Sequence, residues 1–240
     1  HIYISRLGHE VNLGFSFAIF AVLFTFWRKI YIATVFFILS FISYQTEKIF
    51  IPILLIGLFI IFRKELLLIK RKVILILIAS LVIISPFIIA TFSENALIRF
   101  SGTNVFKANE HRFIERSFLL DKAVKENDFI GQILYNRRIL TAQIFLEGYL
   151  SHYNPVWLVT NASNDKHKVP DFGLLHVWVL PLALIGIYTL IRQKFDIKTK
   201  QILFLWFLTA PIAASLATQT PHALRSFVFL PTWQIFASLG

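Results

Sequence analysis

Six or seven long apolar stretches run through this chain, and the short loops between them differ sharply in charge. The clearest stretch, residues 73–92, contains no charged residue. A helix of about 20 apolar residues is long enough to cross the hydrocarbon core of a bilayer. We therefore expect a polytopic membrane protein, in which successive loops alternate between the two sides of the membrane.

Basic residues collect in every second short loop, and the opposite short loops contain Lys48 and Arg225. Cytoplasmic loops of membrane proteins carry such an excess of Lys and Arg, so the basic loops are expected in the cytoplasm. Segments 6–10, 44–48, 93–171 and 218–225 then share the outer side. The residues of the basic loops are Arg28, Lys29, Arg63, Lys64, Lys70, Arg71, Lys72, Arg192, Lys194, Lys198 and Lys200.

Composition supports a membrane protein and argues against several other classes. The chain is 57% hydrophobic and contains 26 Phe, whereas soluble domains are about 45–50% apolar. The net charge of +11 does not indicate nucleic-acid binding, because the basic residues lie at the ends of apolar stretches. The absence of Cys excludes disulfides and Cys-ligated zinc. Because Met is also absent and the chain ends inside an apolar stretch, we interpret it as a segment of a longer protein.

The predicted fold is an all-α bundle of transmembrane helices with a helical region outside the membrane. Residues 1–92 should contain four transmembrane helices, residues 93–171 an extracytoplasmic section, and residues 172–240 three more transmembrane helices. The outer section mixes apolar and charged residues at helical spacing over 109–127 and 128–149. Such helices could lie along the membrane surface and cover a cavity, or could form a small helical bundle of their own.

The outer segments bring several ionisable residues to one side. Arg6 and Glu10 stand one helical turn apart; they form either an interfacial ion pair or part of a cavity. Tyr44, Glu47 and Lys48 share the next outer turn. Lys48 could bind a lipid phosphate as a point charge, or it could anchor the helix at the interface.

The last outer turn contains His222 and Arg225 at the beginning of an apolar stretch. The planar donor fork of Arg suits phosphate, and the amino end of a helix favours an anion. The other outer candidates are aromatic or polar side chains of the kind that contact sugars, although interfacial aromatic residues also form simple membrane belts. Histidine spacing matches no familiar metal-ligand motif. These further candidates are Tyr149, His152, Asp165 and His167.

The order of these motifs resembles the superfamily of protein O-mannosyltransferases and aminoarabinose transferases, which are C-type (GT-C) membrane glycosyltransferases. Ser5-Arg6 followed by Glu10 is similar to the Ser-Arg-x-x-x-(Asp/Glu) block of that family, with Glu in place of the more frequent Asp. Segments 44–48, 148–155 and 165–173 are similar to outer turns and loops of bacterial members. Pro221-His222-Ala223-Leu224-Arg225 resembles the turn that closes the membrane core. The resemblance covers nearly the whole chain.

The resemblance implies transfer of a sugar from a polyprenyl-phosphate donor to a protein, lipid or glycan acceptor at the extracytoplasmic face. The plasma membrane of a bacterium or archaeon is the expected location. In this family the main catalytic carboxylate lies upstream of a block like residues 5–10, so Glu10 is expected to be an accessory acid. No cofactor is expected, and a requirement for a divalent metal stays open. Arg6, Lys48, His222 and Arg225 would bind the donor phosphate, and Tyr44, Glu47, Tyr149, His152, Asp165 and His167 would contact sugar or acceptor.

Other functions remain open at this point. A ligase that moves a whole glycan would use the same chemistry. A transporter or lipid flippase should place ionisable residues near the bilayer midplane, whereas the apolar stretches here are almost uncharged. A non-catalytic membrane scaffold is the third alternative.

Overall fold

The computed structural model describes residues 9–160 and 173–240. Within these ranges the chain folds into helices joined by short turns, without a named strand. Asn104 and Ala217 form an isolated antiparallel bridge. The expected all-α fold is therefore confirmed for the described part of the chain.

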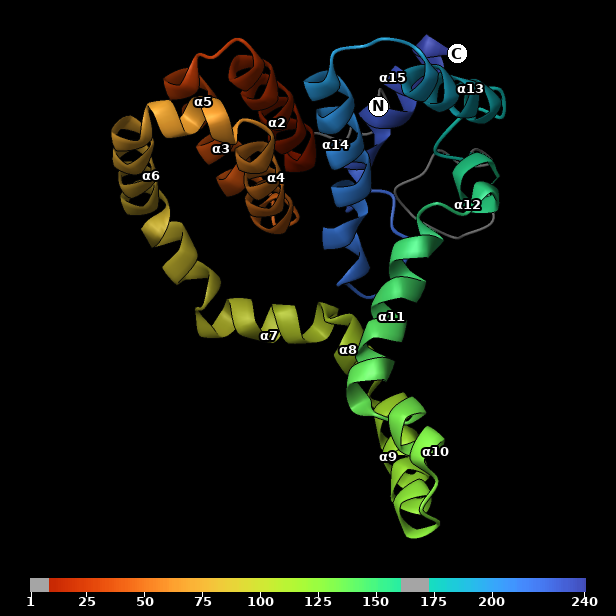
Figure 1. Ribbon diagram of the computed structural model, residues 1–240. Coiled ribbons are helices and arrows are strands. Elements are labelled where there is room, and N and C mark those ends of the chain that lie inside the picture. The colour runs from red at the N-terminus through yellow and green to blue at the C-terminus, as the bar shows by residue number, and fades with distance from the viewer. Residues whose placement is uncertain (1–8, 161–172) are drawn as a thin grey trace.

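The first two helices form an antiparallel hairpin. Helix α2 (Glu10–Phe26) and helix α3 (Ile30–Ser43) are joined by a tight turn (Figure 1). Ala18 and Ala21 of α2 and Ala33 of α3 are almost completely buried. Such small side chains allow two helix backbones to approach closely, so this apolar sequence packs as a helix pair.

Helices α4 (Glu47–Ile61), α5 (Arg63–Leu68) and α6 (Lys70–Thr91) follow. Of the described helices, α6 alone has both the length and the apolar composition needed to cross a membrane, and its most apolar part is not buried inside the protein. The apolar helix α2 has 17 residues and is about 25 Å long, which is shorter than a bilayer core of roughly 30 Å. Membrane crossing by several helices thus stays a prediction.

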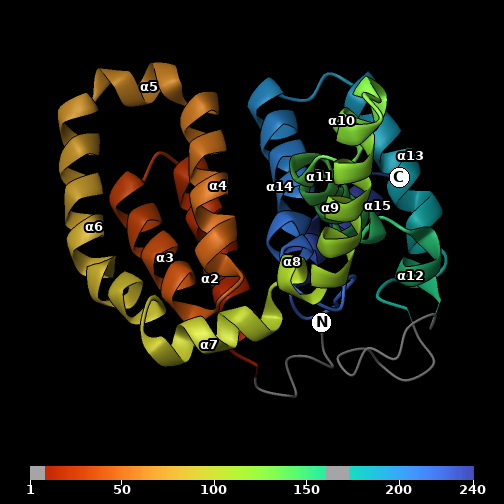
Figure 2. The ribbon, with the colours of Figure 1, turned by 90° about the horizontal axis from the view of Figure 1, so that it is seen from below.

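The outer section forms a bent helical arm. Helix α7 (Glu94–Thr103) runs across the end of α6, and α8 (Val105–Ala108) leads to α9 (Glu110–Lys125). Helices α9 and α10 (Phe129–Leu134) point away from the apolar bundle, and α11 (Arg137–Ser151) returns to it (Figures 1 and 2). The α9–α10 pair therefore does not lie across the end of the bundle, and this arrangement favours the alternative of a separate helical unit.

Local contacts explain the shape of this arm. Asp128 caps α10, because its side chain accepts a hydrogen bond from the Gly131 amide at 3.0 Å, which is the usual role of Asp at this position. Arg112 donates two hydrogen bonds to Glu147, at 2.9 and 3.1 Å. This bidentate ion pair holds α9 against α11.

The C-terminal part contains α12 (Pro155–Val159), α13 (Val179–Arg192), α14 (Ile197–Ser215), the short 3₁₀ helix η1 (Phe227–Phe229) and α15 (Leu230–Leu239). Helices α13 and α15 are in very close contact. A Cβ atom at Gly186 would overlap the Phe236 carbonyl, so only glycine permits this approach.

The two apolar parts of the chain share one core. Helix α14 packs against α4, where the rings of Phe50 and Trp206 meet edge to face at 5.3 Å. The indole of Trp206 donates a hydrogen bond to the Val228 carbonyl at 2.7 Å. The predicted segments 1–92 and 172–240 thus pack together, with the outer section inserted between them in sequence.

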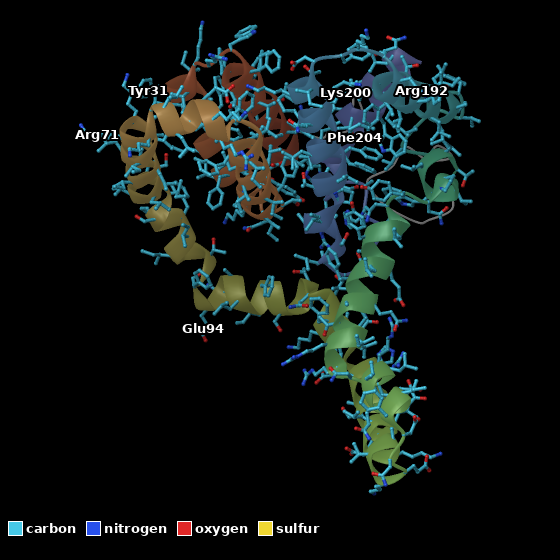
Figure 3. All side chains as sticks on the ribbon, viewed as in Figure 1. Tyr31, Arg71, Glu94, Arg192, Lys200 and Phe204 are labelled. Carbon is cyan, nitrogen blue, oxygen red and sulfur yellow. The ribbon has the colours of Figure 1, made fainter. Side chains whose placement is uncertain are left out.

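The basic loops gather at one end of this core. The Glu65 carboxylate forms ion pairs with Arg28 and Lys198, which belong to the two other basic loops. Arg71, Arg192 and Lys200 lie at this same end, and Glu94 lies at the opposite end (Figure 3). At the opposite end, the Thr218 amide donates a hydrogen bond to the Thr103 carbonyl at 2.8 Å. Among the described residues, the basic loops and the 218–225 turn therefore lie at opposite ends of the core, as the charge pattern predicts.

Candidate functional site

Several segments that are distant in sequence meet where α3 passes into α4. Tyr44 caps the carboxyl end of α3, and Glu47 and Glu10 are the first residues of α4 and α2. The phenol of Tyr44 interacts electrostatically with Arg225, Glu10 and Glu47. We call Glu10, Tyr44, Glu47, His222 and Arg225 the polar cluster, and it lies at the end of the core opposite the basic loops.

Glu47 is the most deeply buried member of the polar cluster, with no exposed surface. Its Oε1 atom has no hydrogen-bond partner among the residues that the structure describes. Its Oε2 atom lies 3.5 Å from the Ser40 hydroxyl, which donates a stronger bond of 2.8 Å to the Gly14 carbonyl. A Cβ at Gly14 would lie 3.0 Å from Cγ of Glu47, so glycine leaves space for this carboxyl group.

A buried carboxyl oxygen without a partner has a cost. Removing a polar group from water without a replacing hydrogen bond costs about 1–3 kcal/mol. Because packing does not explain why the chain places an acid at this position, Glu47 is a candidate for a functional role.

Arg225 is held by backbone contacts within its own turn. Its Nη1 atom donates a hydrogen bond to the Thr218 carbonyl at 2.7 Å, and its amide donates to Nδ1 of His222 at 3.4 Å. No carboxylate forms an ion pair with Arg225 in the part of the chain that the structure describes. The carbonyl of its own turn therefore orients the guanidinium.

His152, predicted to contact sugar or acceptor, is completely buried. Its Nδ1 atom lies 2.7 Å from the Gly148 carbonyl, and its Nε2 atom accepts a hydrogen bond from the His222 amide at 3.4 Å. Burial lowers the pKa of His152 to about 4, an effect that the Gly148 carbonyl opposes and nearby His222 adds to. The ring is therefore neutral at physiological pH, and it contacts the Arg225 turn.

Tyr149 supports the packing of α11 on α14. The hydroxyls of Tyr149 and Tyr153 contact the carbonyls of Leu208 and Phe207, at 2.8 and 3.0 Å, and each other at 2.9 Å. Pro211 cannot donate to the carbonyl four residues earlier, and this carbonyl belongs to Phe207. Tyr153 thus satisfies the Phe207 carbonyl that the proline leaves open, and Tyr149 adds a bond to the next carbonyl. Burial raises the pKa of Tyr153.

The remaining predicted residues lie apart from the polar cluster or outside the described residues. Lys48 donates a hydrogen bond to the Thr91 hydroxyl of α6 at 2.9 Å, so its charge points toward α6. Arg6, Asp165 and His167 lie outside the described residues. Within the described ranges, His, Asp and Glu side chains form no group of three that could hold a metal ion.

Sequence reasoning missed the groups that support this site. The Ser40 hydroxyl contacts Glu47 and donates a hydrogen bond to the Gly14 carbonyl. The Thr218 carbonyl accepts a hydrogen bond from Arg225. Two of these groups are backbone carbonyls, which carry no sequence signal. Ser40 is a polar residue in an apolar helix, and that position was the one available signal.

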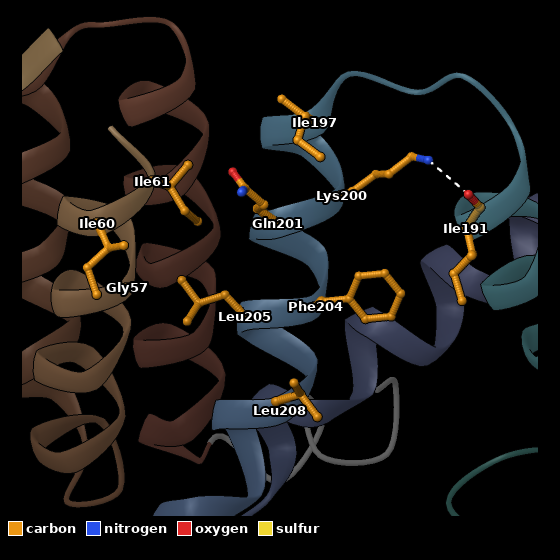
Figure 4. Close-up of a pocket in the computed structure, with 10 residues that line it drawn as sticks. All are labelled: Gly57, Ile60, Ile61, Ile191, Ile197, Lys200, Gln201, Phe204, Leu205 and Leu208. Atoms are coloured by element: carbon orange, nitrogen blue, oxygen red, sulfur yellow. Dashed lines mark hydrogen bonds between the residues drawn. The ribbon is translucent and has the colours of Figure 1, made fainter. Parts of the chain in front are cut away.

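An apolar groove lies nearer the basic end, between α4 and α14 (Figure 4). It has a volume of about 550 Å³ and includes Gly57, Phe204 and Leu205. Lys200 lies at its edge and donates a hydrogen bond to the Ile191 carbonyl at 3.1 Å. Because the lining of this groove is apolar apart from Lys200 and Gln201, the polar cluster is the better candidate for chemistry.

No protein-family model matches the chain, and neither a curated protein nor a solved structure matches it.

Proposed function

We propose that this protein is a membrane glycosyltransferase that uses a polyprenyl-phosphate sugar as donor at the extracytoplasmic face. The observation that carries the proposal is the Arg225 guanidinium, which is oriented by Thr218 and has no ion-pair partner among the described residues. Tyr44 lies within electrostatic range of Arg225, Glu10 and Glu47, at the end of the core opposite the basic loops. A cation and acids in one place suit a reaction that releases a phosphate.

In the proposed reaction, the acceptor hydroxyl oxygen attacks the anomeric carbon while the bond from that carbon to the phosphate oxygen breaks. The phosphate leaves with the bonding electrons, and a carboxylate takes the proton of the acceptor hydroxyl. Arg225 and His222 would bind the phosphate and stabilise its developing charge. Glu10 would be an accessory acid, and Tyr44 would complete the sugar or acceptor side. Glu47, which has no exposed surface, would act through its neighbour Tyr44.

The proposal includes a polytopic membrane arrangement. The separation of the Glu65 end from the polar cluster supports it, since membrane proteins place positive loops on the cytoplasmic side. The short helices could cross a locally thinned bilayer. Membrane lipids and a glycan, lipid or protein acceptor would be the partners.

A transporter or flippase is the second candidate, and buried Glu47 favours it, because ionisable residues among membrane helices often mark transport pathways. Glu47 is, however, the first residue of α4 and lies at the end of the core. Its place beside Tyr44 fits a site at one membrane face better than a site at the midplane.

The test is an assay of the full-length protein in lipid nanodiscs with a panel of labelled polyprenyl-phosphate sugars. Arg225→Ala should lower transfer by about 100-fold, the usual effect of removing a group that stabilises a developing anion. The matched control is Arg138→Ala, since Arg138 is exposed on α11, and it should stay within about twofold of the unchanged protein.

Absence of transfer from every donor would contradict the enzyme proposal. Normal transfer by Arg225→Ala would remove this residue from the site. Movement of intact donor between leaflets without cleavage would support the flippase instead.

A further inference from the structure

His152 cannot contact a substrate directly, because it is fully buried beneath the turn that carries Arg225. It caps the carboxyl end of α11, and its ring packs edge-on against Trp157, with the ring centroids 5.5 Å apart. Its two nitrogens nevertheless contact groups on two different segments. This arrangement suggests a role that is exerted through another residue.

The two contacts of His152 define one tautomer. A carbonyl can only accept a hydrogen bond, so Nδ1, 2.7 Å from the Gly148 carbonyl, carries the proton. Nε2 then keeps its lone pair, and the His222 amide donates to it at 3.4 Å. The ring therefore connects the end of α11 with the 218–225 turn.

The connection continues from His222 to Arg225. Nδ1 of His222 accepts from the Arg225 amide at 3.4 Å, and the His222 carbonyl accepts from the Ser226 amide and hydroxyl at 3.1 and 2.8 Å. The Arg225 side chain in turn donates to the Thr218 carbonyl. The backbone of His222 is thus fixed on both sides, and the guanidinium points where this turn directs it.

We propose that His152 is a positioning residue, which holds the His222 amide through Nε2 and thereby directs the Arg225 guanidinium toward an anionic phosphate. The inference rests on the proposed function. Its ligand class is a lipid-linked monophosphate.

The low pKa of His152 agrees with this role. At neutral pH the ring keeps its acceptor lone pair at Nε2. Protonation would turn Nε2 into a donor that faces the donor amide of His222, and the contact would be lost. His222 is the titratable neighbour that acts on His152, and its own protonation would also oppose a charge on the ring.

The test uses two substitutions, each of which keeps the hydrogen-bonding position of one of the two imidazole nitrogens. His152→Gln extends an amide to the place of Nε2, so its oxygen can still accept from His222. His152→Asn reaches only to the place of Nδ1 and keeps the bond to Gly148. Binding of a polyprenyl monophosphate to the protein in nanodiscs is measured for both, alone and combined with Arg225→Ala.

We expect His152→Gln to bind within about threefold of the unchanged protein, and His152→Asn to bind about tenfold more weakly, the effect of one hydrogen bond. In the Arg225→Ala background, His152→Asn should cause no further loss, because both changes act on one contact. Leu140→Ala is the control, since Leu140 is buried on α11 in a cluster that does not include His152; it should lower the Tm and leave binding unchanged.

Equal binding by the Asn and Gln variants would overturn the positioning role. The same tenfold loss from His152→Asn in the Arg225→Ala background would also overturn it, and so would weakened binding by Leu140→Ala. If Arg225→Ala itself binds the monophosphate normally, the phosphate site of the proposed function fails, and the inference fails with it.

Discussion

The two ends of the helical core differ in how their ionisable side chains are paired. At the basic end, Glu65 pairs with Arg28 and Lys198 near the surface. At the other end, Glu47 is buried with an oxygen that lacks a partner among the described residues, and Arg225 forms no ion pair there. Ionisable groups therefore occur at both ends, and among the described residues the buried carboxyl oxygen without a partner belongs to the polar end.

The basic end therefore bears on membrane orientation, whereas the polar end is the candidate for chemistry. Exposed ion pairs contribute about 0–1 kcal/mol to stability, so the basic end could change in detail with little effect on the fold. Buried groups without partners cost free energy. Among the described residues, the buried carboxyl oxygen without a partner lies at the polar end, so this end contains the candidate for ligand binding.

The largest predicted effect is a loss of stability in acid that originates at the polar end. His152 has a folded pKa of about 4 against about 6.5 when unfolded, so between these values the unfolded chain binds more protons. The contribution of His152 to the free energy of unfolding is complete above pH 6.5. It is lost as pH falls toward 4, and the loss reaches about 3 kcal/mol. Denaturant unfolding in detergent over this pH range measures it.

His152→Gln provides the control for this prediction, because glutamine does not titrate and should flatten the pH dependence. An unchanged slope in the variant would assign the acid sensitivity to other groups.

A smaller effect is expected from Glu47→Leu, which replaces the buried acid by an apolar side chain of similar size. Removing a buried polar group with an open oxygen should leave the free energy of unfolding within about 1 kcal/mol of the unchanged protein, or raise it. Transfer from a polyprenyl-phosphate sugar should nevertheless fall by at least about tenfold. Unfolding and transfer are measured on the same preparation, and full transfer would mean that Glu47 is structural.

The smallest effect is expected at the basic end. The hydrogen bond from Lys198 holds the pKa of Glu65 below its usual value, and Arg28 adds to this shift. The contribution of Glu65 to stability is therefore lost only as pH falls below the ordinary Glu range. Glu65→Gln should leave both Tm and transfer unchanged at pH 7. A fall in transfer as large as that of Glu47→Leu would erase the distinction between the two ends.

Most helices could be predicted from the sequence, because each apolar stretch is long and is closed by charged or polar residues. Their ends were less predictable. Helix α14 begins at Ile197, four residues before the apolar stretch of residues 201–217, because the Asp196 carboxylate accepts hydrogen bonds from the Lys198 and Thr199 amides at 3.1 Å. Apolar character marks the buried part of a helix, and a capping residue can extend it through polar sequence.

The candidate site was predictable in its general location but not in its detailed contacts. Charge counting placed Glu10, Glu47 and Arg225 on one side, and the structure brings them together. The same reasoning grouped Lys48 with them. Neighbouring residues on a helix point about 100° apart, so burial of Glu47 turns Lys48 toward Thr91. The burial of His152 depends on how α11 meets the 218–225 turn, which the sequence does not reveal.

The most direct test of the account is the sidedness of its loops. The chain contains no Cys, so each introduced cysteine is the only labelling site. Gln45→Cys and Gln219→Cys lie at exposed positions near the polar cluster, and Lys64→Cys and Lys194→Cys at exposed positions of the basic loops. In intact cells, a membrane-impermeant maleimide should label the first pair, and the second pair should react only after the membrane is opened. Labelling of position 45 and position 219 from opposite sides would contradict a common site at one membrane face.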